Sequence, residues 1–187
     1  MPDLTKLAAL PPADWDPELA DVISAMQNRP LNVHRLIANN PALLKAWWPL
    51  RQYIVSGGSL GKRNAEIVIL RTAFHMRNTY EWSSHVERGL AAGLSTDDID
   101  NIGDQGGAEL AGADALLVAA VDELVAHHRL GPASLVSLAV HFAQEQVFDL
   151  IAIHNTYTML GCLLNTWPVA LDEHVRSALP KDSVQPW

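Results

Sequence analysis

Apolar residues recur with the period of an α-helix along most of this chain, and no strand pattern competes with it. The segments with this period are residues 17–27, 30–40, 41–56, 62–77, 80–93, 95–103, 113–129, 133–146 and 147–165. Prolines stand at several predicted helix starts, and glycines follow several predicted ends. The pattern therefore predicts an all-α bundle of about eight or nine helices.

Two of these segments, AEIVILRTAF at residues 65–74 and the last one at 147–165, are apolar around most of their circumference. Such helices pack at the centre of a bundle, and amphipathic helices surround them. Residues 1–17 hold several prolines and predict an extended N-terminal segment. The Gly- and Ala-rich residues 104–114 predict a loop within a single domain of residues 1–187.

The composition is that of a globular chain with a buried core, with 187 residues, 49% hydrophobic and 18% charged. A net charge of −8 argues against a nucleic-acid partner, because phosphate binding requires clustered Lys and Arg. The first residues lack the basic start of a signal peptide, and no apolar run approaches the roughly 20 residues that span a bilayer. We therefore expect a cytoplasmic protein that binds neither nucleic acid nor membrane.

Cys162 is the only cysteine of the chain. An intrachain disulfide, a CxxC redox pair and a multi-cysteine zinc site are therefore excluded. Its apolar surroundings, MLGCLLN, predict a packed and unreactive thiol.

Asn78, Glu81 and His85 fall within about a 100° arc of one predicted helix and form a polar stripe. Trp82 belongs to the apolar stripe beside it. A helix of this kind can line a partly dry cleft, in which a carboxylate and an imidazole exchange protons. The alternative is a solvent-facing Glu/His pair without chemistry.

Glu66 precedes four aliphatic residues, so a partner or a function must account for its charge. Arg63 lies one turn earlier and could simply form a structural salt bridge with it, and Arg71 lies on the same helix. On the last long helix, His154 and Tyr157 share a face and could reach Glu81 and His85 across the bundle. Alternatively, they satisfy each other as core polar groups.

The segment RNAEIVILRTAFHMRNTYEWSSHVERGLAAGLSTDDIDNI, residues 63–102, resembles the carboxymuconolactone decarboxylase family, which is related to the alkylhydroperoxidase D-like proteins. The match is carried by Arg63, Glu66, Glu81, His85 and the triplet Gly93-Leu94-Ser95. The resemblance implies an alkylhydroperoxidase D-like helical bundle. It also implies a homo-oligomer, often a trimer or hexamer, with the site near subunit contacts.

The chain departs from the peroxidase branch of this family at two positions. That branch carries a CxxC motif between its Glu and its His, and here the two cysteine places hold Asn78 and Glu81. Thiol-based peroxide reduction needs a thiolate and a resolving thiol, so its mechanism is not expected. The decarboxylase branch is similar at Glu81 and His85, although its downstream Tyr-Gly-rich segment is not evident.

These features predict a cofactor-independent lyase, decarboxylase-like, or an isomerase that acts on a small carboxylated or lactone-type compound of aromatic catabolism. His85 would be the general acid/base, Glu81 would orient it and Glu66 would complete a proton relay. The candidate substrate-binding residues are Arg63, Arg71, Asn78, Trp82, His154 and Tyr157.

Neither a metal nor a cofactor is expected, because Glu81 and His85 offer only two ligands and no second pair of this kind is present. Two other hypotheses stay open. One is a peroxidase-like or metal-dependent redox protein that uses a metal at Glu81 and His85 or an external thiol. The other is a ligand-binding member of the family without catalytic activity.

Overall fold

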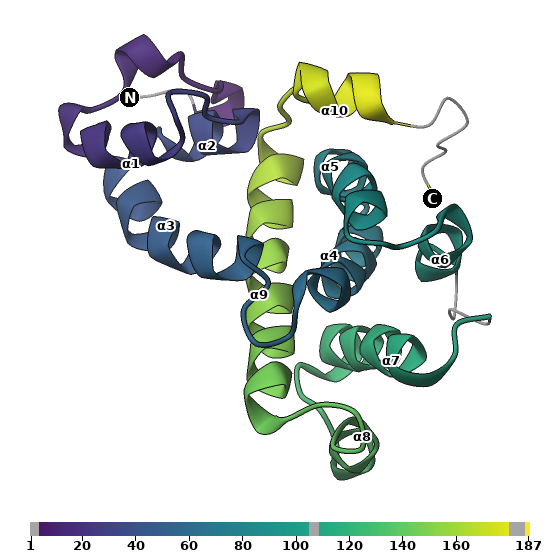
Figure 1. The fold of residues 1–187 in the computed structure, drawn as a ribbon. Coiled ribbons are helices and arrows are strands. Elements are labelled where there is room, and N and C mark those ends of the chain that lie inside the picture. The colour runs from purple at the N-terminus through teal and green to yellow at the C-terminus, as the bar shows by residue number, and fades with distance from the viewer. Residues whose placement is uncertain (1–3, 105–108, 180–185) are drawn as a thin grey trace.

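The computed structural model describes residues 4–104, 109–179 and 186–187, and these residues form an all-helical fold without strands (Figure 1). The α-helices are α1 (Ala20–Ala25), α2 (Asn32–Ile37), α3 (Pro41–Val55), α4 (Lys62–Met76), α5 (Thr79–Ala91), α6 (Thr96–Ile102), α7 (Gly112–His127), α8 (Pro132–Leu138), α9 (Gln144–Thr166) and α10 (Glu173–Ala178). The predicted all-α class is confirmed.

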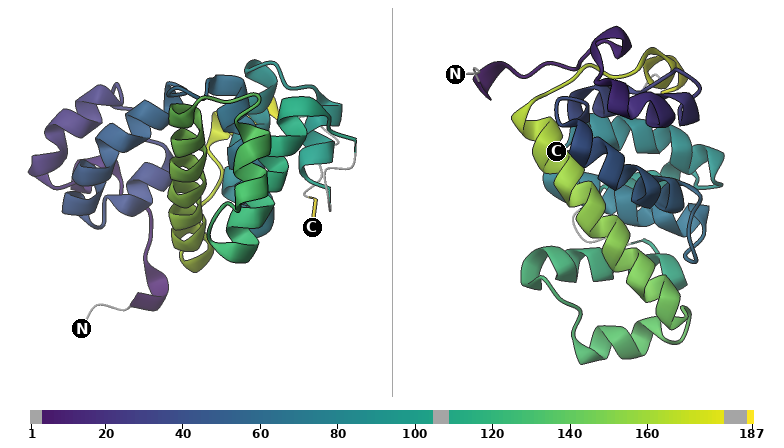
Figure 2. Two further views of the ribbon diagram at one scale, coloured as in Figure 1. Left: turned by 90° about the horizontal axis from the view of Figure 1, so that it is seen from below. Right: turned by 90° about the vertical axis from the view of Figure 1, so that its left-hand side faces the viewer.

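Helices α4 and α9 form the centre of the fold, as their apolar circumference predicts. They pack against each other, and α4 also packs against α5 and α7. Ile67, Val68 and Leu70 of α4 and Leu150 and Ile153 of α9 are almost completely buried. In both Figure 1 and Figure 2, α9 stands between the N-terminal helices on one side and the α4–α7 group on the other.

Local caps fix the ends of the two helices that follow α4. Asn78 accepts a hydrogen bond from the Glu81 N–H at 2.8 Å and so starts α5. At α6, Ser95 and Asp98 exchange side-chain to backbone bonds of 2.9 and 3.1 Å, which is the capping box that the sequence predicts. Because Arg77 adopts a left-handed conformation, with φ of 49°, the chain reverses sharply between α4 and α5.

The C-terminal helix α10 is absent from the predicted set of about eight or nine helices. It has only six residues and buries a single side chain, Val175, against the rest of the fold. A helix this short carries too little periodicity to be recognised, and its contacts with α5 stabilise it instead.

At the N-terminus, the described part of the predicted extended segment holds short 3₁₀ turns at Leu4–Lys6 and Pro12–Asp14, and the first α-helix begins only at Ala20. Trp15 is buried and its indole N–H donates to the Leu10 carbonyl at 3.2 Å. Within the predicted loop 104–114, residues 105–108 lie outside the described part of the chain. Helix α7 already begins at Gly112.

Cys162 is exposed, so the prediction of a packed thiol is wrong. Its neighbours Leu160, Gly161 and Leu164 face the core, and Cys162 lies on the outward side of α9. Against the expectation that no segment approaches the length of a membrane span, the same helix, 23 residues long, is long and apolar enough to cross a membrane, and it is the one such helix in the described residues. Half of its most apolar window is buried inside the fold, as in a core helix of a globular protein.

Candidate functional site

Helices α4 and α5 bring the three predicted catalytic side chains together. His85 Nδ1 lies 2.5 Å from Glu66 Oε2, and His85 Nε2 lies 3.5 Å from Glu81 Oε2. His85 is 2% exposed, and Glu66 retains 14% of its side-chain exposure. The α4–α5 reversal at Arg77 places the two helices side by side, which is why residues 19 positions apart form this short contact.

The second ring nitrogen of His85 has two weaker neighbours of opposite kind. Besides the Glu81 carboxylate, the Arg88 guanidinium approaches Nε2 at 3.4 Å. A protonated Nε2 can donate toward Glu81, and an unprotonated Nε2 can accept from Arg88. Tyr157 of α9 stands edge-on to the imidazole, with ring centroids 4.9 Å apart at 89°. Both protonation states of Nε2 thus find a partner.

The electrostatic surroundings favour the protonated ring. Burial on its own lowers the pKa of His85, but the Glu66 carboxylate and the Glu81 contact outweigh burial and raise that pKa above its usual value. For the Tyr157 phenol, burial acts in the opposite direction and raises the pKa, and the nearby Glu81 charge adds to this effect. Tyr157 is therefore a neutral phenol beside a readily charged imidazole.

A small chamber of about 30 Å³ adjoins the Glu81 side of the imidazole. In the described residues, three fully buried side-chain polar atoms lack a hydrogen-bond partner: Trp47 Nε1, Glu81 Oε1 and Ser84 Oγ. All three residues line this chamber. A buried unpaired polar atom costs about 1–3 kcal/mol, so three such residues around one chamber mark it as a candidate binding place for a small polar group.

A larger cleft of about 260 Å³ lies on the Glu66 side of the same imidazole. His85, Arg88 and Tyr157 line both the cleft and the chamber. The other walls of the cleft are mainly apolar, and Lys62 adds a cation. The His85 ring therefore lies between the cleft, which is mainly apolar, and the chamber, which has more polar lining residues.

Two arginines at the chamber were not among the predicted site residues. Neither Arg51 nor Arg88 lies within 4 Å of a carboxylate in the described part of the chain, so both charges can meet an anion. Arg51 stacks on the Trp48 ring at 4.9 Å. The position of Arg88, three residues after His85, is a helical signal that could have identified it. Arg51 lies one helical turn after Trp47 on α3. Nothing in the sequence of α3 indicates that this face meets the Glu81/His85 helix.

His34 of α2, which was not among the predicted site residues, also lines the chamber. Burial, with Arg51 and Arg88 nearby, lowers its pKa to about 3. Its Nδ1 accepts the Leu31 N–H at 3.1 Å, so the ring is neutral with its proton on Nε2. The chamber therefore holds one neutral and one readily charged imidazole.

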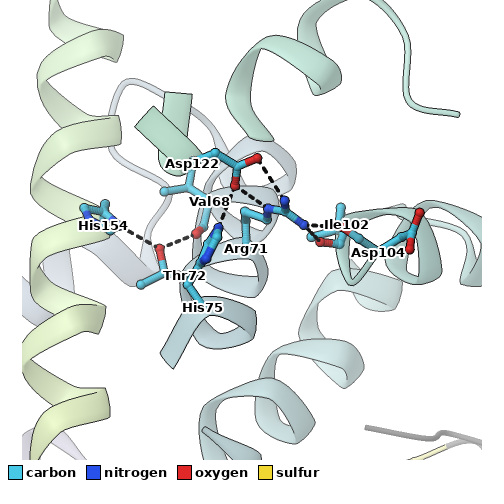
Figure 3. Close-up of polar contacts among 8 residues, drawn as sticks. All are labelled: Val68, Arg71, Thr72, His75, Ile102, Asp104, Asp122 and His154. Carbon is cyan, nitrogen blue, oxygen red and sulfur yellow. Dashed lines mark hydrogen bonds and ion pairs between the residues drawn. The ribbon is translucent and has the colours of Figure 1, made fainter. Parts of the chain in front are cut away.

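The structure does not bring Arg63 or Arg71 to His85. Arg63 forms a bidentate pair with Asp114 at 2.7 and 2.8 Å, not with Glu66. Arg71 forms a bidentate pair with Asp122, at 2.6 and 2.8 Å, and also donates to the Ile102 and Asp104 carbonyls (Figure 3). Both arginines point from α4 toward α6 and α7, so their predicted contact with substrate at His85 is corrected.

Three further candidates also lie away from the imidazole. Asn78 is held by its cap bond to Glu81 N and by a 2.7 Å bond to Asn165. Trp82 packs edge-on against Trp187, 6.1 Å between centroids. His154 bonds Thr72 at 3.0 Å (Figure 3). It lines a different cavity. Of the predicted binding residues, Tyr157 alone lines the site. It was predicted to share a face with His154, but the two side chains are about 60° apart around the α9 axis, and only Tyr157 is turned toward His85.

No group of three or more His, Cys, Asp or Glu side chains in the described ranges is arranged to hold a metal ion. At the proposed pair, the 2.5 Å contact with Glu66 occupies His85 Nδ1, and the Glu81 oxygen approaches Nε2 itself. Both ring nitrogens of His85 therefore have a carboxylate of the cluster as a neighbour.

Comparison with solved structures identifies the fold. A peroxidase-related protein from Ralstonia eutropha JMP134, described as an alkylhydroperoxidase AhpD core, aligns with a TM-score of 0.80 at 16% identity, over 97% of this chain and 100% of that chain. A peroxidase-related protein from Silicibacter sp. TM1040 aligns with a TM-score of 0.75 at 14% identity, over 93% and 95% of the two chains. The predicted alkylhydroperoxidase D-like fold is confirmed.

A debrominase, Bmp8, solved in complex with 2,3,4-tribromopyrrole, aligns with a TM-score of 0.72 at 15% identity over 92% of this chain and 94% of that one. No curated protein sequence gives a significant match. The family model described as "Carboxymuconolactone decarboxylase family" matches residues 41–125, the segment that holds Glu66, Glu81 and His85. Residues 41–125 of the chain thus match the carboxymuconolactone decarboxylase family, as the motif at residues 63–102 predicts.

Proposed function

We propose that this protein is an acid/base catalyst for a small organic substrate, with His85 as the proton-transfer group and no bound cofactor. The reaction is a decarboxylase-like lyase step or an isomerisation of a carboxylated or lactone-type compound. The observation that carries this proposal is the position of His85 between Glu66 and a chamber with three unpaired polar atoms. The family match and the similarity to small-molecule enzymes support it.

In the proposed mechanism, Glu66 holds the Nδ1 proton of His85, and Nε2 exchanges a proton with the substrate. For a lyase, the electron pair of the breaking carbon–carbon bond moves to the α-carbon and its conjugated oxygen as CO₂ leaves. Nε2–H then protonates that carbon. For an isomerase, Nε2 removes a proton from one carbon and returns it to another. The raised pKa of His85, caused against the effect of burial by Glu66 and Glu81, keeps the acid form available near neutral pH.

The chamber offers donors for the oxygen on which charge develops. Trp47 Nε1–H and Ser84 Oγ–H have no partner in the described structure, and both residues line the same 30 Å³ space. Donors held in a dry site stabilise an enolate oxygen more strongly than water does. Arg88, placed between chamber and cleft, attracts the substrate carboxylate in the role first assigned to Arg63 or Arg71.

Two further expectations belong to the proposal. Three exposed apolar side chains, Val136 of α8, Val140 of the α8–α9 connection and Phe148 near the start of α9, favour a homo-oligomer. A cytoplasmic location agrees with the similarity to alkylhydroperoxidase D-like proteins. Trimer or hexamer is the expected state from the family resemblance.

A peroxidase-like role is the second candidate, favoured by the peroxidase-related proteins of the same fold. Its chemistry would need a thiol or metal from outside the chain, because Cys162 lies exposed on α9 and lines neither the chamber nor the cleft. Peroxide turnover by metal-stripped protein with dithiothreitol as the thiol distinguishes this role from proton transfer.

The test uses unsaturated lactone carboxylates and 2-oxo acids in D₂O, with CO₂ release and deuterium incorporation followed by NMR. Wild-type protein should release CO₂ or exchange a carbon-bound proton, and His85→Gln should lower the rate by about 10²–10⁴-fold. The exposed His141 provides the matched control, because His141→Gln should leave the rate unchanged. Normal turnover by a folded His85→Gln protein would exclude the assignment. Binding without turnover in wild type would favour the non-catalytic hypothesis.

A further inference from the structure

A second cavity lies on the other side of α4, away from His85. It has a volume of about 470 Å³ and is lined by residues of α4, α7, α8, α9 and the α7–α8 connection. None of its lining residues belongs to the 30 Å³ chamber or the 260 Å³ cleft. A volume of this size is in the range of small-molecule sites.

Most of the cavity wall is apolar. Met76, Leu124, Leu130, Leu135 and Ile151 contribute aliphatic or thioether surface from all four helices and the α7–α8 connection. No Asp or Glu lines the cavity, whereas three histidines and Arg129 do. An organic cation would therefore find no opposite charge, and the space suits the body of a neutral or weakly acidic molecule.

One buried side chain presents an unused acceptor at this cavity. Thr72 Oγ1 donates its only hydrogen to the Val68 carbonyl at 2.7 Å, so it must accept from His154 Nδ1–H at 3.0 Å (Figure 3). The proton of the neutral ring is thereby fixed on Nδ1, and Nε2 keeps its lone pair. His154 is 6% exposed, and Nε2 has no partner in the described part of the chain.

The neighbouring groups keep His154 neutral and hold the cavity wall rigid. Burial, together with the charges of His75 and His128, lowers the pKa of His154. His75 Nε2 lies 2.6 Å from Asp122, and Arg71 donates two hydrogen bonds to the same carboxylate (Figure 3). Asp122 is thus turned toward α4 and away from the cavity. His128 and Arg129 are exposed at the rim.

We propose that this cavity is a second ligand site, which binds a small aromatic or alicyclic molecule through one hydroxyl group that donates to His154 Nε2. The apolar wall accommodates the ring, and the fixed acceptor selects the hydroxyl, because an analogue without it leaves Nε2 buried and unpaired. The site is independent of the acid/base centre at His85.

The experiment compares phenol with toluene, which has nearly the same shape and lacks the donor. Isothermal titration of the full-length protein should give about tenfold tighter binding of phenol, the discrimination expected of one hydrogen bond to a buried acceptor. In His154→Phe, which keeps a ring of similar size, the two affinities should become equal. In addition, the ¹⁵N resonance of His154 Nε2 should shift on phenol addition and not on toluene addition.

Two further variants keep the test decisive. Leu135→Trp fills the cavity from its exposed edge and should abolish binding of both probes without touching His154. His85→Gln should leave phenol binding unchanged, because His85 lines the other cavities. Equal affinities of phenol and toluene in wild type would overturn the proposal. So would a phenol preference that survives in His154→Phe or disappears in His85→Gln.

Discussion

The His85 cluster and the His154 cavity each contain a buried imidazole, but the two rings have pKa values shifted in opposite directions. Both rings come from helices packed on α4, and both are less than a tenth exposed. His85 Nδ1 meets the Glu66 carboxylate, whereas His154 Nδ1 meets the Thr72 hydroxyl. The pKa of His85 is raised by the carboxylates against the effect of burial, and that of His154 is lowered by burial and nearby histidines. The hydrogen-bond partner therefore decides the charge of a buried imidazole.

The two regions also differ in how completely their polar groups are paired. Beside the His154 cavity, Arg71, His75 and Asp122 satisfy one another and two backbone carbonyls. At the His85 chamber, the three buried polar atoms of Trp47, Glu81 and Ser84 have no partner in the described structure. A paired network stabilises the fold, and an unpaired one is prepared for a ligand.

The largest expected effect is on acid stability and concerns His34, the neutral imidazole of the His85 chamber. Its pKa falls from 6.5 to about 3 on folding, so the unfolded chain binds more protons between these pH values. Its stabilising contribution is present above pH 6.5 and is lost as the pH falls through the folded pKa. The free energy of unfolding should lose roughly 5 kcal/mol over this window. Urea unfolding at several pH values measures it, and His34→Asn should flatten the acid slope.

His85 and His154 should shape opposite sides of the same stability curve. The contribution of His85, whose pKa is raised, is complete below its unfolded value of 6.5 and is lost as the pH rises through the folded pKa. The contribution of His154, whose pKa is lowered, is lost as the pH falls. NMR titration of the two rings should place their midpoints on opposite sides of 6.5. Midpoints on the same side would remove the basis of the comparison.

A somewhat smaller effect is expected from Asp122→Ala in the paired network. The substitution leaves the Arg71 guanidinium, 3% exposed, without its counter-charge and should lower the unfolding free energy by about 3 kcal/mol. Asp114→Ala is the matched control, because its partner Arg63 is 37% exposed and the loss should stay below about 1 kcal/mol. Urea unfolding followed by circular dichroism measures both. Equal losses would contradict the structural role given to Asp122.

The smallest effects come from removing one hydroxyl in each region. Thr72→Val leaves His154 Nδ1–H unpaired and should lower the unfolding free energy by about 1–2 kcal/mol. Ser84→Ala removes an unpaired buried hydroxyl and should change it by less than about 0.5 kcal/mol. Thermal unfolding of the two variants at pH 7 makes the measurement. A larger loss for Ser84→Ala than for Thr72→Val would mean that the chamber is already paired in solution.

The candidate site was predictable where its residues share a helix or a motif. The i,i+4 spacing of Glu81 and His85 and the aliphatic surroundings of Glu66 identified the cluster that the structure brings together. Arg88, three residues after His85, was equally within reach of this reasoning. His34 and Trp47 were not, because they lie on α2 and α3 and meet the chamber only through the packing of those helices.

Helical periodicity alone accounts for the all-α class, the central places of α4 and α9 and the face shared by Glu81 and His85, because neighbours along one helix are set by its 3.6-residue turn. The tertiary structure decides the partners on other helices. Arg71 pairs with Asp122, 51 residues away, and His154 turns to Thr72 while Tyr157 turns to His85. Cys162 faces outward although its sequence neighbours are apolar. The rotation of each helix about its own axis settles such contacts, and that rotation depends on the packing of the whole core.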